Sequence, residues 1–143
     1  RDVPAGQTRD YIFGYTILND VSARDVQTAH KQWYFGKSLD GFTPIGPCIV
    51  TADAFADYPP RLGIRSFVNG EKRQDSNTAL QIFDIDHVIA ELSQGMTLKA
   101  GTIIATGTPA GVGMGMDPPQ FLKPGDVVRC EIDGIGTLTN PVK

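Results

Sequence analysis

The sequence lacks long hydrophobic runs, basic clusters and an apolar leader, and each absence excludes a class of protein. Its longest apolar stretches are far too short to span a bilayer, and no h-region of a signal peptide is visible. The net charge is −3, from 13 basic and 16 acidic residues, and phosphate binding needs clustered Lys and Arg. We therefore expect a cytoplasmic protein with no nucleic-acid or membrane partner.

Cysteine and glutamate are both scarce. The two cysteines, Cys48 and Cys130, lack metal-ligand spacing and lie among apolar or strand-like residues, which favours buried free thiols over a disulfide. Glutamate occurs only at Glu71, Glu91 and Glu131. We expect Glu71 in a hairpin turn and Glu91 on a surface helix, so neither is an attractive metal ligand.

The size and composition indicate one globular domain. The chain has 143 residues, of which 41% are hydrophobic and 20% charged. Because it begins at Arg1 with a polar segment, we expect a single domain over residues 1–143 that is incomplete at its N-terminus. His30 and His87 lack a serine or cysteine nucleophile at a plausible spacing, so each is expected on the surface or at a helix end.

The pattern of apolar residues and chain breakers predicts a β-rich mixed domain with about two short helices. One helix is expected at residues 22–31 with Ser22 as its cap. The other is expected at residues 86–92, with Asp84 or Asp86 as its cap. Asn-Gly and Asp-Gly dipeptides predict hairpin turns. Strands are expected at residues 11–18, 48–51, 62–68, 71–74, 103–106, 127–132 and 135–138.

A polar run, residues 19–27, directly follows an apolar stretch that is predicted to be a strand. Polar groups crowded at the end of a buried strand are costly to desolvate, which points to a metal ion or an anionic substrate. If residues 22–31 are helical, Asp20, Arg24 and Gln27 share one face. A hard cation such as Mg²⁺ binds carboxylate oxygens, but one aspartate is not a complete site. The alternative is structural, an aspartate cap with an internal Arg–Asp pair.

Two loops carry further candidates. Lys37 is the only cation in residues 33–47, a loop rich in glycine and proline, where a lysine can bind an anion or exchange a proton. The alternative is a lysine that extends its head group to water. In residues 106–113, backbone N–H groups and threonine hydroxyls can bind a carboxylate or phosphate. This loop matches neither a Walker A loop nor a dinucleotide fingerprint, and the alternative is a plain glycine loop.

Taken together, these segments resemble the C-terminal catalytic domain of the fumarylacetoacetate hydrolase family. The resemblance implies a mixed α/β, β-rich roll of mixed sheets with a few short helices, a homodimer, and a central divalent metal ion. The matching pieces, in chain order, are Gly14-Tyr15-Thr16, Asn19-Asp20-Val21-Ser22-Ala23-Arg24-Asp25, Gly36-Lys37-Ser38, Gly46-Pro47, Val68-Asn69-Gly70-Glu71 and Thr106-Gly107-Thr108-Pro109-Ala110-Gly111-Val112-Gly113.

The resemblance also implies roles for individual residues. Asp20 would be a ligand of Mg²⁺ or Mn²⁺, and Arg24 and Gln27 would line the substrate pocket. Lys37 would be catalytic and contact the developing enolate or the carboxylate of the substrate, which Thr108 would also bind. The family's Glu-x-Glu metal pair has no counterpart in this chain, whose first residues match the stretch just after that pair.

Three hypotheses of function follow. The first is a metal-dependent hydrolase or lyase that cleaves C–C bonds of small 2-oxo or 1,3-dioxo acids, by hydrolysis of acylpyruvate-like acids or decarboxylation of oxaloacetate-like acids, through a metal-stabilised enolate. The second is an isomerase or tautomerase of unsaturated 2-oxo diacids in aromatic catabolism. The third is a non-catalytic fragment that binds only a ligand or a partner subunit.

Overall fold

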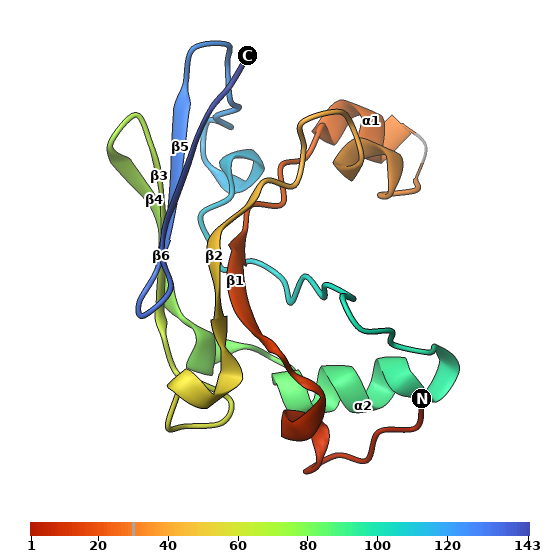
Figure 1. The fold of residues 1–143 in the computed structure, drawn as a ribbon. Coiled ribbons are helices and arrows are strands. Elements are labelled where there is room, and N and C mark those ends of the chain that lie inside the picture. Colours follow the sequence, from red (N-terminus) through yellow and green to blue (C-terminus); the bar gives the residue numbers. More distant parts are fainter. Residues whose placement is uncertain (30) are drawn as a thin grey trace.

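The computed structural model describes residues 1–29 and 31–143, and two antiparallel sheets dominate it (Figure 1). The prediction for His30 therefore lies outside the described residues. One sheet pairs β1 (Gly14–Leu18) with β2 (Ile45–Thr51). The other has the order β4-β3-β5-β6, with β3 (Gly63–Val68), β4 (Glu71–Asn77), β5 (Val127–Ile132) and β6 (Gly136–Pro141).

The helices are short, as expected for a strand-rich mixed fold. The α-helices of residues 1–29 and 31–143 are α1 (Arg24–Ala29) and α2 (Ile85–Gly95). In the part of the chain that the structure describes, 3₁₀ turns occur at η1 (Thr8–Tyr11), η2 (Phe35–Lys37), η3 (Ala52–Ala54), η4 (Thr78–Leu80) and η5 (Gly113–Gly115). This confirms the predicted fold class.

The β3–β4 hairpin is confirmed where its turn was predicted. Asn69 and Gly70 both adopt positive φ angles, 53° and 85°, as the two central residues of a type I′ turn require. The strand β4 runs three residues further than predicted, to Asn77. Within β4, Gln74 bonds to the loop of residues 106–113.

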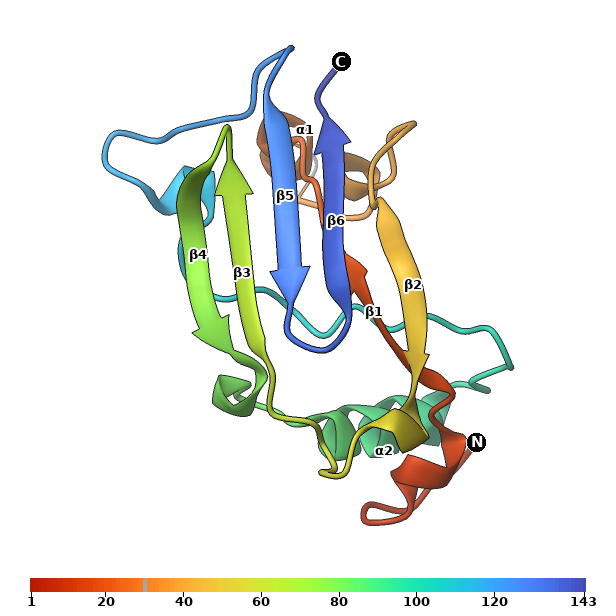
Figure 2. The same ribbon diagram turned by 60° about the vertical axis from the view of Figure 1, so that its left-hand side comes forward.

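Helix α2 is capped as predicted and anchors the start of the chain (Figure 2). Its N-cap Asp84 accepts a hydrogen bond of 2.8 Å from the backbone N–H of His87. Near the other end of α2, Ser93 binds the first residues. Its Oγ accepts from Val3 N at 3.0 Å, and its carbonyl accepts from Asp2 N at 2.9 Å. His87 is exposed and stacks on Phe83, in agreement with the surface position expected for it.

The predicted strand at residues 103–106 and the predicted helix cap at Ser22 were both wrong. Residues 103–106 form no strand, because a strand needs a partner for its N–H and C=O groups and no described segment pairs with this one. In Figure 1 the segment runs past β1 on its way from α2. Ser22 does not cap a helix, since α1 begins only at Arg24. Its hydroxyl donates instead to the carbonyl of Asp20, at 3.1 Å.

The hydrophobic core is sparse. Its buried hydrophobic members are Val3, Ile17, Ile89, Val128 and Ile135. Many large apolar side chains are exposed, among them Ile82 at 93%. Both cysteines are free, as expected, but neither is fully buried: Cys130 is half-buried, and Cys48 is exposed because it lies on β2 of the small two-stranded sheet. No helix among the described residues is long and apolar enough to cross a membrane.

Candidate functional site

The predicted metal ligand and the predicted catalytic lysine lie in direct contact. The ammonium of Lys37 forms an ion pair with the carboxylate of Asp20 and donates to Ser22 Oγ at 3.0 Å. The side chain of Lys37 is 25% exposed and that of Asp20 41% exposed. An ion pair so open to water contributes little to stability. Its effect is to fix the position of the ammonium group.

A close backbone contact between α1 and η2 brings these residues together. The N–H of Ala23 donates to the carbonyl of Gly36 at 2.8 Å. A Cβ at Gly36 would lie 2.8 Å from the Ala23 oxygen and 2.9 Å from the backbone nitrogen of Gln27, so only glycine fits here. Lys37, the next residue, is thereby held beside the start of α1.

The other two residues predicted for this site pair with each other on α1. Arg24 Nη1 donates to Gln27 Oε1 at 2.9 Å, across the i, i+3 spacing that brings helical neighbours together. Gln27 is only 5% exposed, so its amide oxygen is fixed and orients the guanidinium. Asp20 precedes α1, so the shared helical face expected for it was wrong, and Lys37 brings it close to the helix instead.

Thr108 lies in a different part of the molecule. It is exposed, and its Oγ1 accepts a bond of 2.8 Å from Gln74 Nε2. Within the described residues no hydrogen bond or ion pair joins it to Asp20, Arg24, Gln27 or Lys37. Thr108 lines a largely apolar cavity of about 520 Å³, and its role in substrate binding stays a prediction.

Strand β1 connects that cavity to the Asp20 site. Tyr15 and Thr16 line the cavity, and the same strand leads directly to Asp20. Burial raises the pKa of the Tyr15 hydroxyl, so this group is a neutral hydrogen-bond donor at neutral pH. Its ring packs edge-on against Phe55, with the centroids 5.6 Å apart.

The described residues do not by themselves fit the expected metal ion. Mg²⁺ takes about six oxygen ligands, with at least one or two carboxylates. Asp20 offers one carboxylate, and its nearest charged partner is the ammonium of Lys37. No cluster of three or more His, Cys, Asp or Glu side chains suited to a metal occurs in residues 1–29 and 31–143. Metal binding at Asp20 therefore stays a prediction.

Gln74 and Gly36 are the residues that sequence reasoning missed. Gln74 Nε2 also donates to the carbonyl of Pro109 at 2.8 Å, and its Oε1 accepts from Ser66 Oγ at 2.8 Å. One amide thus ties β3 and β4 to the loop of Thr108. No local sequence pattern marks Gln74. Gly36 could have been found, because it directly precedes the candidate residue Lys37.

Comparison with known proteins gives the same family along the whole chain. The family model for the fumarylacetoacetate (FAA) hydrolase C-terminal region matches residues 1–143. A curated relative, described as oxaloacetate tautomerase YisK of Bacillus subtilis, is 52% identical over 133 residues, which cover 93% of this chain and 44% of the relative.

Solved structures agree with the sequence comparison. A fumarylacetoacetate hydrolase from Exiguobacterium antarcticum superposes with a TM-score of 0.96 at 52% identity, covering 100% of this chain and 51% of that one. A 2-hydroxyhepta-2,4-diene-1,7-dioate isomerase from Mycobacterium marinum superposes with a TM-score of 0.87 at 48% identity. The match covers 99% of this chain and 52% of that one. The chain thus spans about half the length of these relatives, and it belongs to the fumarylacetoacetate hydrolase C-terminal family.

Proposed function

We propose that the protein acts on a small anionic 2-oxo acid and catalyses its keto–enol tautomerisation. The observation that carries this proposal is the ammonium of Lys37, held by Asp20 and Ser22 beside the helix that presents Arg24. Of the three charged side chains in this argument, Lys37 and Arg24 are positive and Asp20 is negative. Their excess of positive charge suits an anionic substrate. The 52% identity to a relative described as an oxaloacetate tautomerase supports the reaction type.

The chemistry requires stabilisation of an enolate. When a C–H bond next to the carbonyl breaks, negative charge develops on the carbonyl oxygen, and a prepositioned N–H donor lowers the energy of that state. Lys37 would donate to this oxygen. Arg24, oriented by Gln27, would bind the substrate carboxylate as a planar fork. Reprotonation on oxygen gives the enol, so the reaction neither gains nor loses atoms.

Isomerisation of an unsaturated 2-oxo diacid is the second candidate. It is favoured by the 48% identity to a solved structure described as a 2-hydroxyhepta-2,4-diene-1,7-dioate isomerase. Loss of the proton from such a substrate gives a conjugated dienolate, and the proton returns to a more distant carbon. Hydrolysis and decarboxylation would instead form the enolate of the product as a C–C bond breaks, and they would release a fragment or CO₂, which product analysis distinguishes from both isomerisations.

Members of the family in general depend on a divalent metal ion. When bound, such an ion supplies a Lewis acid for the carbonyl oxygen. Asp20 is the side chain of this chain that we propose as a ligand, and Mg²⁺ or Mn²⁺ is the ion that its hard oxygens favour.

The test follows the enol absorbance of oxaloacetate with and without added Mn²⁺. We expect catalysed tautomerisation in the unmodified protein and a loss of about 10²–10³ in rate for Lys37→Met, the usual effect of removing one oxyanion donor. Lys31→Met removes an exposed lysine of equal charge and should leave the rate unchanged. Full activity of Lys37→Met would contradict the role of Lys37. If neither the unmodified protein nor a variant raised the tautomerisation rate above that in buffer, with or without Mn²⁺, the non-catalytic alternative would be favoured.

A further inference from the structure

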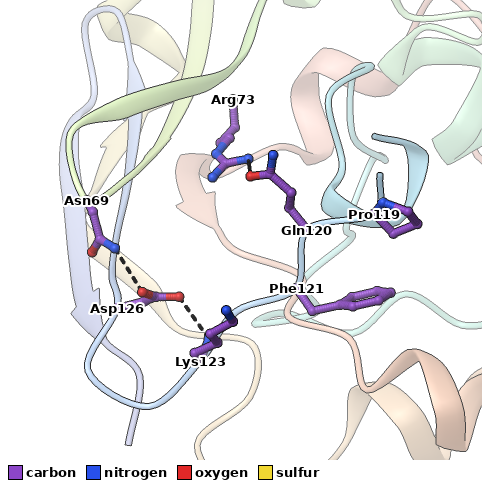
Figure 3. A pocket seen from close by; sticks show the side chains of 7 residues that line it. All are labelled: Asn69, Arg73, Pro119, Gln120, Phe121, Lys123 and Asp126. Carbon is purple, nitrogen blue, oxygen red and sulfur yellow. Dashed lines mark hydrogen bonds between the residues drawn. The ribbon is translucent and has the colours of Figure 1, made fainter. Parts of the chain in front are cut away.

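A second cavity lies between the tip of the β3–β4 hairpin and the loop that leads into β5 (Figure 3). Its volume is about 380 Å³, within the range of small-molecule sites. None of the residues assigned above lines it. The lining consists of Asn69, Arg73, Pro119, Gln120, Phe121, Lys123 and Asp126.

The hydrogen-bond acceptors at one end of this cavity are occupied. Asp126 Oδ1 accepts from Asn69 Nδ2 at 2.8 Å, and Asp126 Oδ2 accepts from the backbone N–H of Lys123 at 2.8 Å. Asn69 Oδ1 accepts from Val127 N at 2.9 Å. The hydrogen bonds from Asn69 and from the backbone N–H of Lys123, and to a smaller extent the nearby cations, lower the pKa of Asp126. The carboxylate is thus satisfied by the protein itself.

Donors remain unused at the other end. The guanidinium of Arg73, whose side chain is 15% exposed, donates from Nη1 to Gln120 Oε1 and, at 2.9 Å, to Met116 Sδ. Its Nη2 approaches the exposed carboxylate of Glu71 at 3.3 Å. Its Nε is buried and has no hydrogen-bond partner among the described residues. The ammonium of Lys123 forms no ion pair, and Gln120 Nε2 donates no hydrogen bond, within the described part of the chain.

We propose that this cavity, the Arg73–Lys123 pocket, binds a small oxyanion, a carboxylate or a phosphate. Within the described residues, the side-chain groups of the lining that lack a partner are Arg73 Nε, Gln120 Nε2 and the ammonium of Lys123. All three are donors, so the complementary ligand is rich in acceptors. The lining carries two cations against one carboxylate, and that carboxylate is already engaged. A guanidinium fork matches the geometry of both carboxylate and phosphate.

The ion pair with Glu71 does not block such a ligand. The side chain of Glu71 is 66% exposed, and ion pairs open to water are weak. An oxyanion inside the cavity would contact the side-chain donors of Lys123 and Gln120, with which Glu71 forms no hydrogen bond or ion pair among the described residues. Because the pocket joins the hairpin to the loop of Gln120 and Lys123, its ligand would stabilise the folded state by mass action. This site is independent of the proposed tautomerase chemistry.

The test is a titration with inorganic phosphate and, separately, with malonate, each compared with sodium chloride at equal ionic strength. The readouts are the NMR resonance of the Arg73 Nε–H group and the thermal unfolding midpoint. We expect a saturable shift of the resonance and a raised midpoint with at least one of the two anions. Tighter binding of phosphate identifies a tetrahedral oxyanion, and tighter binding of malonate identifies a carboxylate.

Matched variants distinguish binding in the cavity from a nonspecific effect of ions on the protein surface. Lys123→Ala should weaken binding about tenfold, as expected for loss of one charged hydrogen bond, whereas Lys99→Ala, an exposed lysine outside the cavity, should not. Both changes lie on exposed side chains, so both variants should fold, and the unfolding midpoint without anion verifies this. Equal effects of the two variants, or a response that chloride reproduces, would overturn the proposal.

Discussion

Gly36 determines how closely α1 and η2 approach each other. It is buried, and its backbone contacts Ala23 and Gln27 without room for a side chain. The position of Lys37 beside Asp20 depends on this contact, because Lys37 is the last residue of η2. At the residue scale, the site therefore depends on the lack of a side chain at Gly36 as well as on its charged groups.

We predict that Gly36→Ala destabilises the protein by about 1–3 kcal/mol, since an added methyl group in a close-packed contact forces backbone shifts. Urea unfolding followed by circular dichroism measures the change. Gly95→Ala is the matched control, because a Cβ at Gly95 meets no atom within 4 Å. Equal stability of the two variants would show that α1 and η2 separate without cost.

At the scale of elements, the first turn of α2 holds the N-terminal segment through the carboxylate of Asp86. Thr8 is 0% exposed, and its Oγ1 donates to Asp86 Oδ1 at 2.6 Å, while Gly6 N donates to Asp86 Oδ2 at 2.7 Å. The hydroxyl of Thr8 also contacts that of Tyr58. These bonds, above all that from Thr8, lower the pKa of the Asp86 carboxyl.

This arrangement predicts a pH dependence of stability. Because the pKa of Asp86 is lower in the folded state, its carboxylate stabilises the fold above the unfolded value of about 3.9. That contribution is lost as the pH falls through the lower, folded-state pKa. Other bound aspartates act in the same direction, so the unfolding free energy of Asp86→Asn is compared with the unmodified protein from about pH 6 to about pH 3.

We expect Asp86→Asn to be less stable at the upper pH and to lose less stability on acidification. Asp57→Asn, on an exposed loop, is the control and should follow the unmodified protein. A parallel pH profile for Asp86→Asn would show that its carboxylate has no linkage to folding.

At the scale of the whole molecule, the exposed apolar surface stands out. A domain of this length normally buries roughly two-thirds of the surface of its unfolded chain, yet few of its hydrophobic side chains are buried. Leu80, Ile82 and Phe83 are exposed at 74%, 93% and 60% in the segment between β4 and α2. Contiguous exposed apolar residues mark interaction surfaces.

We therefore propose that the protein is a homodimer, because association removes apolar surface from water at about 25 cal/mol per Å². Light scattering coupled to size exclusion should give twice the mass of the chain, with dissociation on dilution. The mass of a single chain at every concentration would contradict the proposal.

Locally encoded features were predictable from the sequence. The Asn69-Gly70 turn and the Asp84 cap are set by backbone preferences of a few residues, so the hairpin and α2 formed where expected. Alternation of apolar residues placed β5 with its observed bounds, Val127–Ile132. The family, too, was identifiable from short motifs of the sequence alone, because each motif keeps its residue types and its order along the chain.

Features that depend on distant partners were decided only by the tertiary structure. Residues 103–106 have the composition of a strand, but a strand forms only where another backbone satisfies its hydrogen bonds. The contact of Lys37 with Asp20, and that of Gln74 with Thr108, join residues 17 and 34 positions apart. Composition and periodicity report what a segment prefers, whereas such pairs depend on how the elements pack.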